Sequence, residues 1–280
     1  MKVVIFGTGF LGSKLLDNIS KKFTVVGADI NPINHRIHKV DATNKKDVEN
    51  FLSEINPDVV IDTVALSSYF LCEKDYDLCN LLNFNTAQNI ADACRIIDAK
   101  MIFISSSYLY DGKKGNYSEK DLPNSTNNYA KSKIKAENYV LDLKKSIVLR
   151  LETLYGYDKN KNKIAFGTNT FDKEIEVGHP NLLRAPVYVD DVSRVILELI
   201  KKNKSGIFHV ASNKKIKWID FLMNLAELSN SKDKIKLVDS SSWILEPPND
   251  SSLDTTKINS LKIHITSFNE AISELKILSK

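Results

Sequence analysis

The sequence predicts an α/β protein built on a doubly wound parallel sheet, with a smaller α/β substrate domain interleaved into its C-terminal half. Short apolar segments rich in Val and Ile alternate with segments whose apolar residues recur at helical spacing. Such strands are typical of a parallel sheet that is covered on both faces. A glycine-rich turn joins the first strand to the first helix, as expected where this kind of sheet binds a phosphate.

The elements follow one another regularly through the first half of the chain. After the glycine turn, Leu15, Leu16 and Ile19 share one face of a first helix. Further strands and helices are expected in the order strand 23–28, helix 47–55, strand 58–64, helix 81–97, strand 101–104, helix 129–143 and strand 146–151. The first strand covers residues 2–6.

The regular alternation ends after residue 151. Residues 156–186 are polar and are expected to be rich in loops. The expected later elements are helix 192–200, strand 206–210, helix 218–228 and a helix from residue 269. The sequence shows no internal repeat and no low-complexity linker, so the two domains are expected to be interleaved. We expect residues 1–150 and 187–203 to form the dinucleotide-binding domain, and residues 151–186 and 204–280 to form the substrate domain. Trp218 and Trp243 are assigned to packing in this smaller domain.

Composition narrows the function classes. The chain has 280 residues, of which 42% are apolar, which supports a packed core and excludes extensive disorder. The net charge is +4, but basic and acidic residues are interleaved, so the sequence favours no nucleic-acid partner. No apolar segment is long enough to span a membrane and no charged leader precedes one, so a cytoplasmic protein is expected.

The cysteine and histidine patterns indicate neither a disulfide framework nor a metal site. The three cysteines are odd in number and none is in a C-x-x-C pair, and the five histidines are scattered. Cys94 is in an apolar helical segment, where it is expected to be a small core residue.

The first strand leads into Gly7-x-Gly9-x-x-Gly12, which predicts a dinucleotide-binding Rossmann turn. The first glycine permits a tight turn, the second lets a diphosphate approach the backbone, and the third lets helix and strand pack closely. Phe10 and Leu11 would offer backbone N–H groups to the phosphates at the helix N-terminus.

An acid about 20 residues after the glycine turn is the second part of this motif. It is Asp29, at the end of the second strand, and its carboxylate would accept hydrogen bonds from the adenosine ribose. A carboxylate there repels a 2′-phosphate, whereas His35 and Arg36 just downstream could neutralise one. The expected cofactor is therefore NAD or NADP, with NAD slightly favoured.

Asp41 is expected to end a strand near the adenine, and Asp41 and Ala42 are expected to contact the cofactor there. The alternative is that the side-chain oxygen of Asp41 or Thr43 caps the helix that follows. Both interpretations place these residues in a turn after a strand.

Tyr129 and Lys133 are four residues apart, which places them on one face of a predicted helix. Y-x-x-x-K is weak evidence alone, but a second segment supports it: the strand over residues 101–104 runs directly into a series of hydroxyl residues that includes Ser106. Ligands bind at the carboxyl edge of such sheets. We therefore expect Ser106 and Tyr129 to converge beside the nicotinamide.

In order and spacing, these motifs resemble the extended short-chain dehydrogenases. More narrowly, the chain resembles the dTDP-4-dehydrorhamnose reductases, and this resemblance extends over nearly its whole length. The segments that carry it are residues 7–12, 105–112, 129–133, 184–192 and 248–254.

The resemblance assigns catalytic roles to three residues. Tyr129 would be the general acid that protonates a carbonyl oxygen as hydride arrives. Lys133 would hold the nicotinamide ribose and lower the tyrosine pKa, and both residues would contact the cofactor. Ser106 would donate a hydrogen bond to the reacting oxygen.

The resemblance also implies a substrate site. Ser107 and Tyr108 would contact the sugar nucleotide, although Ser107 stands where the reductases carry Asp. Arg184 is the candidate clamp for the diphosphate, and its alternative is an arginine exposed on a loop. Asp190 and Asp191 are expected to cap the next helix.

The function implied is reduction of the 4-keto group of a nucleotide-linked 4-keto-6-deoxysugar by NADH or NADPH, by a protein that can form a homodimer. Two alternatives remain open. One is an NAD-dependent nucleotide-sugar epimerase or dehydratase, although Ser107 and Tyr108 replace the Asp-Glu pair that a dehydratase needs. The other is a non-catalytic cofactor-binding regulatory subunit, similar to the β subunit of methionine adenosyltransferase.

Overall fold

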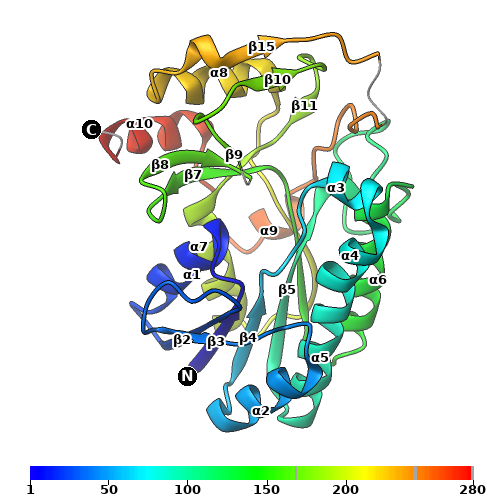
Figure 1. Cartoon of the computed structure of the whole chain (residues 1–280), viewed down its shortest axis with the longest axis vertical. Helices are drawn as coiled ribbons and strands as arrows, with labels where there is room; N and C mark the ends of the chain where they lie inside the picture. Colours follow the sequence, from blue (N-terminus) through cyan, green and yellow to red (C-terminus); the bar gives the residue numbers. More distant parts are fainter. Residues whose placement is uncertain (168, 242–244, 279–280) are drawn as a thin grey trace.

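A seven-stranded parallel sheet forms the centre of the computed structural model, which describes residues 1–167, 169–241 and 245–278 (Figure 1). The strand order is β13-β6-β5-β4-β1-β2-β3, and every neighbouring pair is parallel. The strands are β1 (Lys2–Phe6), β2 (Thr24–Asp29), β3 (Ile37–Lys39), β4 (Val59–Asp62), β5 (Lys100–Ser106), β6 (Ile147–Leu151) and β13 (Gly206–Val210). The predicted doubly wound fold is confirmed.

The strand order reverses between β1 and β4. From β1 the chain builds outward to β2 and β3, then returns to β4 and builds the other way to β5, β6 and β13. In such sheets the ligand site lies outside the carboxyl ends of the strands at this reversal. The fold therefore predicts a site where β1 and β4 end.

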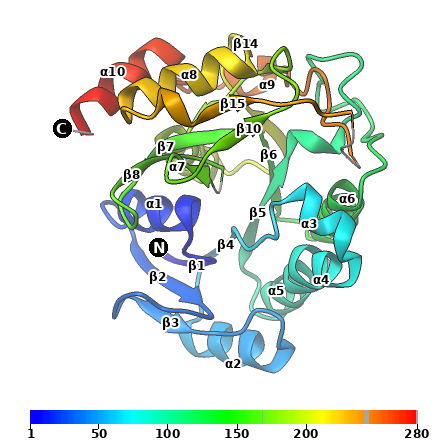
Figure 2. The same ribbon diagram turned by 45° about the horizontal axis from the view of Figure 1, so that its top comes forward.

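Helices cover both faces of the sheet because the strand side chains alternate between two apolar clusters. Val3 and Ile5 face helices α1 and α7, whereas Val4 and Phe6 face helices α2, α5 and α6 (Figures 1 and 2). These helices are α1 (Phe10–Ile19), α2 (Lys45–Ile55), α5 (Thr86–Ile96), α6 (Asn128–Leu141) and α7 (Val189–Lys201). Every helix in the described ranges is too short or too polar to cross a bilayer.

A smaller part lies beyond the carboxyl ends of the sheet (Figure 1). Its own apolar cluster combines aromatic and aliphatic side chains, mostly of β7, β8, α8 and α10. Its elements are β7 (Leu154–Asp158), β8 (Lys163–Phe166), β9 (Asn169–Thr170), β10 (Ile175–Val177), β11 (Leu183–Arg184), β12 (Val187–Tyr188), β14 (Ile216–Lys217), β15 (Ile235–Leu237), α8 (Trp218–Leu228) and α10 (Phe268–Leu278). Trp218 packs on Phe221 in this cluster, and Trp243 lies outside the described residues.

Two expectations about this half of the chain need correction. Residues 156–186 are loop-rich as expected, but they also contain short strands that were not expected, and these form parts of a four-stranded and two two-stranded sheets. Strands of two to five residues are too short for the alternation of side chains to show in the sequence. The strand β13, expected in the substrate domain, is instead the edge strand of the central sheet, paired with β6.

The cysteines also differ from expectation. Cys72 and Cys79 form a disulfide, with their Cα atoms 4.9 Å apart, while Cys94 is a buried free thiol as expected. The bridge joins α3 (Tyr69–Lys74) to α4 (Tyr76–Asn80), and the turn at Asp75 between these short helices brings the sulfurs together. Helices this short were not predicted, so the pairing could not be. The other short elements are a π-helix (Leu81–Asn85), 3-10 turns (Ser107–Leu109, Lys232–Lys234) and α9 (Thr256–Asn259).

Candidate active site

The three glycines after β1 occupy different environments. Gly7 has a φ of +80°, and a Cβ there would lie 2.9 Å from Thr63 Oγ1. A Cβ on Gly12 would lie 1.8 Å from the carbonyl oxygen of Gly7, so the helix packs directly on the turn. A Cβ on Gly9 would meet no atom of the described chain within 4 Å. The turn is therefore closed at its first and third glycines and open at the second, which fits the approach of a diphosphate.

The helix that begins at this turn has an uncapped N-terminus. Gly9 is the N-cap residue, no side chain caps the helix, and its first turn holds no acid. The N–H groups and the dipole at this end favour an anionic ligand. Phe10 and Leu11 are the first two residues of this helix, so their backbone N–H groups have no acceptor within it.

Asp29 lies at the carboxyl end of β2, directly beside the glycine turn. Its Oδ2 accepts hydrogen bonds from the backbone N–H and the hydroxyl of Thr8, at 2.6 and 2.9 Å. Its Oδ1 accepts a bond from the N–H of Asn31 at 3.0 Å. These bonds fix the carboxylate at the position that the sequence motif assigns to a ribose ligand.

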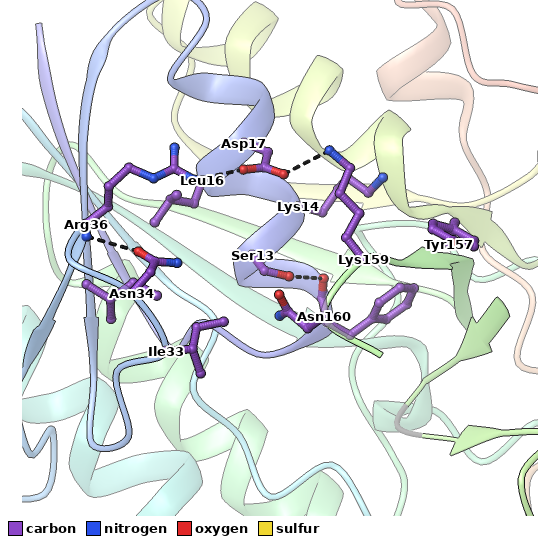
Figure 3. Close-up of a pocket in the computed structure, with 12 residues that line it drawn as sticks. Ser13, Lys14, Leu16, Asp17, Ile33, Asn34, Arg36, Tyr157, Lys159 and Asn160 are labelled. Carbon is purple, nitrogen blue, oxygen red and sulfur yellow. Dashed lines mark hydrogen bonds and ion pairs between the residues drawn. The ribbon is translucent and has the colours of Figure 1, made fainter. Parts of the chain in front are cut away.

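Arg36 is held away from this carboxylate. Asp17, on α1, accepts hydrogen bonds from Arg36 Nη2 at 3.0 Å and from Lys159 Nζ at 3.1 Å (Figure 3). The three side chains line a cavity of about 210 Å³ on the outer side of α1. Together the two cations hold the pKa of Asp17 below its usual value against the opposing effect of burial. Arg36 is thus already paired, and His35 is exposed on the same loop.

Asp41 and Ala42 lie in the turn between β3 and α2. Asp41 Oδ1 accepts bonds from the N–H and hydroxyl of Thr43, at 2.9 and 2.7 Å. Asn89 donates to the carbonyl oxygen of Ala42 at 3.0 Å, which ties the turn to α5. The helix cap is Asn44, which accepts from the N–H of Lys46, so the alternative that Asp41 or Thr43 caps α2 is wrong.

Ser106 and Tyr129 meet at the carboxyl end of β5. Asn127 caps α6 by accepting from the N–H of Ala130, which places Tyr129 in the first turn of the helix. Tyr129 is 7% exposed, and burial raises the pKa of its phenol to about 12, although a side-chain hydrogen bond with Ser106 acts in the opposite direction. The sequence motifs thus converge as expected, but burial, not a charge from Lys133, dominates the tyrosine pKa.

Lys133 lies one turn further along α6 and is 2% exposed. Its Nζ donates to the carbonyl oxygen of Ile104 at 2.6 Å and lies 4.0 Å from the centroid of the Phe103 ring. Burial lowers the pKa of Lys133 to about 8, while the negative charges of Asp62 and Glu137 oppose this effect.

Asp62 is a residue of this site that the sequence analysis did not identify. It ends β4, is 1% exposed, and its Oδ1 accepts from the N–H of Val64 at 2.9 Å. Burial raises the pKa of its carboxyl to about 6, against the lowering effect of Lys133. The sequence does contain a signal for it: an acid at the carboxyl end of a buried strand, the same feature that identified Asp29.

The predicted substrate residues divide into two groups. Ser107 is 1% exposed and donates to Glu152 Oε1 at 3.0 Å, and Ser251 also donates to that oxygen. This placement does not support the predicted contact between Ser107 and substrate. Its hydroxyl instead joins the segment after β5 to the segment after β6.

Arg184 and Tyr108 lie together. Arg184 is 1% exposed and belongs to β11, so it is not an exposed loop arginine. Its Nη1 donates to the carbonyl of Leu183 at 2.8 Å, its Nη2 donates to Tyr108 Oη at 3.4 Å, and its guanidinium lies 5.5 Å from the tyrosine ring. Tyr108 also lies near Tyr69, with ring centroids 5.9 Å apart.

Asp190 and Asp191 were expected to cap α7, but neither is its N-cap residue. The helix begins at Val189 with Tyr188 as its N-cap, so Asp190 and Asp191 are in its first turn. Asp191 accepts from the N–H and hydroxyl of Thr266, and Asp190 accepts from Asn18. Both acids tie the helix to neighbouring segments.

Residues 1–277 match the family model described as the RmlD substrate binding domain. The chain belongs to this family. The match covers both the central sheet and the smaller part, and so confirms the resemblance that the sequence motifs indicate.

Relatives of this RmlD-family chain include proteins of two kinds. Methionine adenosyltransferase 2 subunit beta of Mus musculus is 27% identical over 289 residues, which cover 98% of this chain and 86% of the relative. The dTDP-4-dehydrorhamnose reductase of Aggregatibacter actinomycetemcomitans is 27% identical over 239 residues, covering 79% of this chain and 80% of the relative. The crystal structure of a dTDP-4-dehydrorhamnose reductase from Bacillus anthracis in complex with NADP has a TM-score of 0.84 at 25% identity, covering 99% of this chain and 98% of that one.

Proposed function

We propose that this RmlD-family protein reduces the 4-keto group of a nucleotide-linked 4-keto-6-deoxysugar. The chain is an NAD(P)-dependent oxidoreductase of the extended short-chain dehydrogenase type. The observation that carries the proposal is the convergence of Ser106, Tyr129 and Lys133 at the carboxyl edge of the sheet that carries the open glycine turn.

The residues around the glycine turn fit a nicotinamide dinucleotide. The open side of Gly9 and the uncapped N-terminus of α1 would hold the diphosphate, with Phe10 and Leu11 as N–H donors. Asp29 would accept from the adenosine ribose. NAD is favoured over NADP, because a carboxylate lies at the ribose position and Arg36 is paired with Asp17 instead of being free to bind a 2′-phosphate.

When bound, the reduced nicotinamide supplies a hydride to the carbonyl carbon of the sugar. Tyr129 donates the phenolic proton to the carbonyl oxygen as negative charge develops there. Its raised pKa keeps the proton in place at neutral pH until the carbonyl accepts it. Ser106 donates a hydrogen bond to the same oxygen, and the Lys133 ammonium, one helical turn below, holds the ribose and stabilises the phenolate that remains.

Arg184 and Tyr108 are the proposed contacts to the nucleotide part of the substrate. A guanidinium that is almost fully buried favours an anionic partner, and a diphosphate offers two adjacent negative groups. Its Nη2 has only the 3.4 Å contact with Tyr108 Oη in the described part of the chain, so it has a donor left for a ligand. The aromatic pair Tyr69 and Tyr108 would provide an apolar surface beside it.

The direct test measures oxidation of NADH and of NADPH with a dTDP-linked 4-keto-6-deoxyhexose. Tyr129→Phe should lower turnover by about 10²–10⁴-fold, because it removes the general acid, while NADH binding persists. Tyr139→Phe is the matched control: this phenol lies on the same helix but donates to Asp92, away from the site, at 2.6 Å. Turnover that survives in Tyr129→Phe would contradict the assigned role.

The relative in mouse makes a regulatory subunit the second candidate. Such a protein would bind the nicotinamide cofactor, leave it unconsumed with every 4-keto sugar nucleotide, and co-purify with a partner enzyme. An intact set of Ser106, Tyr129 and Lys133 favours the reductase.

A further inference from the structure

A buried acid faces the candidate catalytic lysine from a neighbouring strand. Asp62 is the last residue of β4, and its Cα pairs with that of Phe103 on β5. Residues paired in this way point their side chains to the same face of the sheet. That face is the one covered by α5 and α6, where the ammonium of Lys133 lies over the Phe103 ring.

We propose that Asp62 is the counter-ion that keeps Lys133 charged in the buried site, and hence a positioning residue for the reduction. The inference rests on the proposed function, because it concerns the role of Lys133 there. It assigns a task to a residue that none of the sequence motifs includes.

Hydrogen bonding leaves Asp62 available for this role. Its Oδ1 accepts from Val64, but Oδ2 is buried and accepts no hydrogen bond from the described part of the protein. A buried carboxylate oxygen without donors is unfavourable unless a positive charge compensates it. Lys133 supplies that charge, and its one hydrogen bond within the described residues, to Ile104, leaves two further N–H donors.

The other acid near Lys133 is already paired. Glu137, four residues further along α6, receives three hydrogen bonds from the Arg150 guanidinium, at 3.0, 3.1 and 2.6 Å. Both partners are almost fully buried, so Arg150 neutralises Glu137 locally. Asp62 is therefore the nearby acid whose negative charge is not neutralised by Arg150 and can stabilise the ammonium of Lys133.

Two further titratable groups that lie near the pair in the described structure, Cys94 and Tyr129, are neutral. Cys94 faces Asp62 from α5, and burial raises the pKa of its thiol to about 12. Tyr129, one turn before Lys133, also keeps its proton at neutral pH. The electrostatic coupling is reciprocal: Asp62 raises the pKa of Lys133, and Lys133 lowers the pKa of Asp62.

The direction of the effect on catalysis follows from these charges. Asp62 is ionised above its pKa of about 6, and Lys133 is charged below its pKa of about 8, so both charges coexist between these pH values. Without the negative charge of Asp62, this acid no longer opposes the effect of burial on the pKa of Lys133. The pKa of Lys133 should then fall by about one unit or more, as expected for loss of a nearby opposite charge.

The first experiment is the pH profile of kcat/KM for NADH-dependent reduction, which reports pKa values of the free enzyme. In Asp62→Asn the alkaline loss of activity should move to lower pH by about one unit or more. Asp158→Asn is the control, since it removes another buried acid, 3% exposed, from β7 in the smaller part. An Asp62→Asn profile with the wild-type midpoint would overturn the proposal, because a purely structural loss lowers activity without moving the midpoint.

The second experiment needs no substrate and so separates this inference from the proposed function. The infrared band of the protonated Asp62 carboxyl is assigned by its loss in Asp62→Asn, or in Asp62→Ser should the first variant not fold. Lys133→Met should raise the midpoint of this band by about one pH unit or more, and Lys133→Arg, which keeps the charge, should leave it near the wild-type value. A midpoint unchanged in Lys133→Met would refute the pairing, whether or not the protein reduces sugar nucleotides.

Discussion

Gly9 and Gly12 allow the two functions of the glycine turn, folding and cofactor binding, to be separated by the same small substitution. A methyl group on Gly12 would lie 1.8 Å from the carbonyl oxygen of Gly7 and 2.9 Å from its carbon. Both are backbone atoms, so α1 must move away from the turn. Such overpacking costs about 1–3 kcal/mol, and each kcal/mol lowers the Tm of a domain of this size by roughly 2–4 °C.

The same methyl group on Gly9 should weaken cofactor binding and leave the stability of the protein nearly unchanged. Gly9 has a φ of −66° and extended backbone, which Ala can adopt, and open space surrounds the new Cβ. The free energy of unfolding of the free protein should therefore stay within about 1 kcal/mol of wild type, and its Tm should stay close to the wild-type value. The methyl group would, however, stand where the diphosphate approaches, so NADH affinity should fall by about tenfold or more, equivalent to ~1.4 kcal/mol.

The assay combines thermal unfolding without ligand and NADH titration followed by fluorescence. Gly12→Ala should melt several degrees lower, and Gly9→Ala should melt normally but bind NADH poorly. Unimpaired NADH binding by Gly9→Ala would refute the argument that a diphosphate approaches the open side of this turn. A normal Tm for Gly12→Ala would show that helix and turn are not packed as tightly as the geometry indicates.

Three further predictions concern other parts of the molecule. Asp29→Asn should raise the affinity for NADPH, because it removes the negative charge that repels a 2′-phosphate. The ratio of the Kd values for NADPH and NADH, measured by titration, should therefore fall. Thiol titration of the unreduced, denatured protein should find one free thiol, that of Cys94, and Cys79→Ala should lower the free energy of unfolding by about 2–3 kcal/mol because it opens a short loop. Burial lowers the pKa of His209 to about 3, so the unfolded chain binds a proton that the folded one does not between about pH 6.5 and 3. Stability should fall with acidification across this window, and His209→Gln, measured by urea unfolding at several pH values, should flatten that fall; an unchanged slope would contradict the assignment.

The sequence predicted the centre of the sheet well because the strands β1, β4, β5 and β6 are largely buried on both faces. Val3 to Phe6 point alternately into two apolar clusters, so the whole segment is apolar and easy to recognise. The glycine turn could be placed because close backbone approach permits only glycine at fixed positions. Asp29 could be placed because it ends a strand about 20 residues after that turn. The meeting of Ser106 with Tyr129 followed from topology, because both segments end at the same edge of the sheet.

The features that the sequence did not predict depend on contacts between distant segments. The strands between residues 154 and 184 are short, and β10 and β11 pair with the distant strands β15 and β14, so local pattern does not define them. Ser107 has the residue type of a ligand contact, yet its hydroxyl binds Glu152 and points into the protein. Cys72 and Cys79 pair only because a break between two short helices brings them together.

The inner face of α6 shows why these long-range contacts matter for the proposed chemistry. Lys133 and Glu137 are four residues apart on this face. Glu137 forms an ion pair with Arg150 from β6, and Asp62 from β4 is the counter-ion proposed for Lys133. The four buried charges alternate in sign, so their net charge is zero although each alone would be costly to bury. Removing any one of them leaves its partner uncompensated, and the helix that carries Tyr129 is therefore positioned by the same charges that set the protonation of the lysine beneath it.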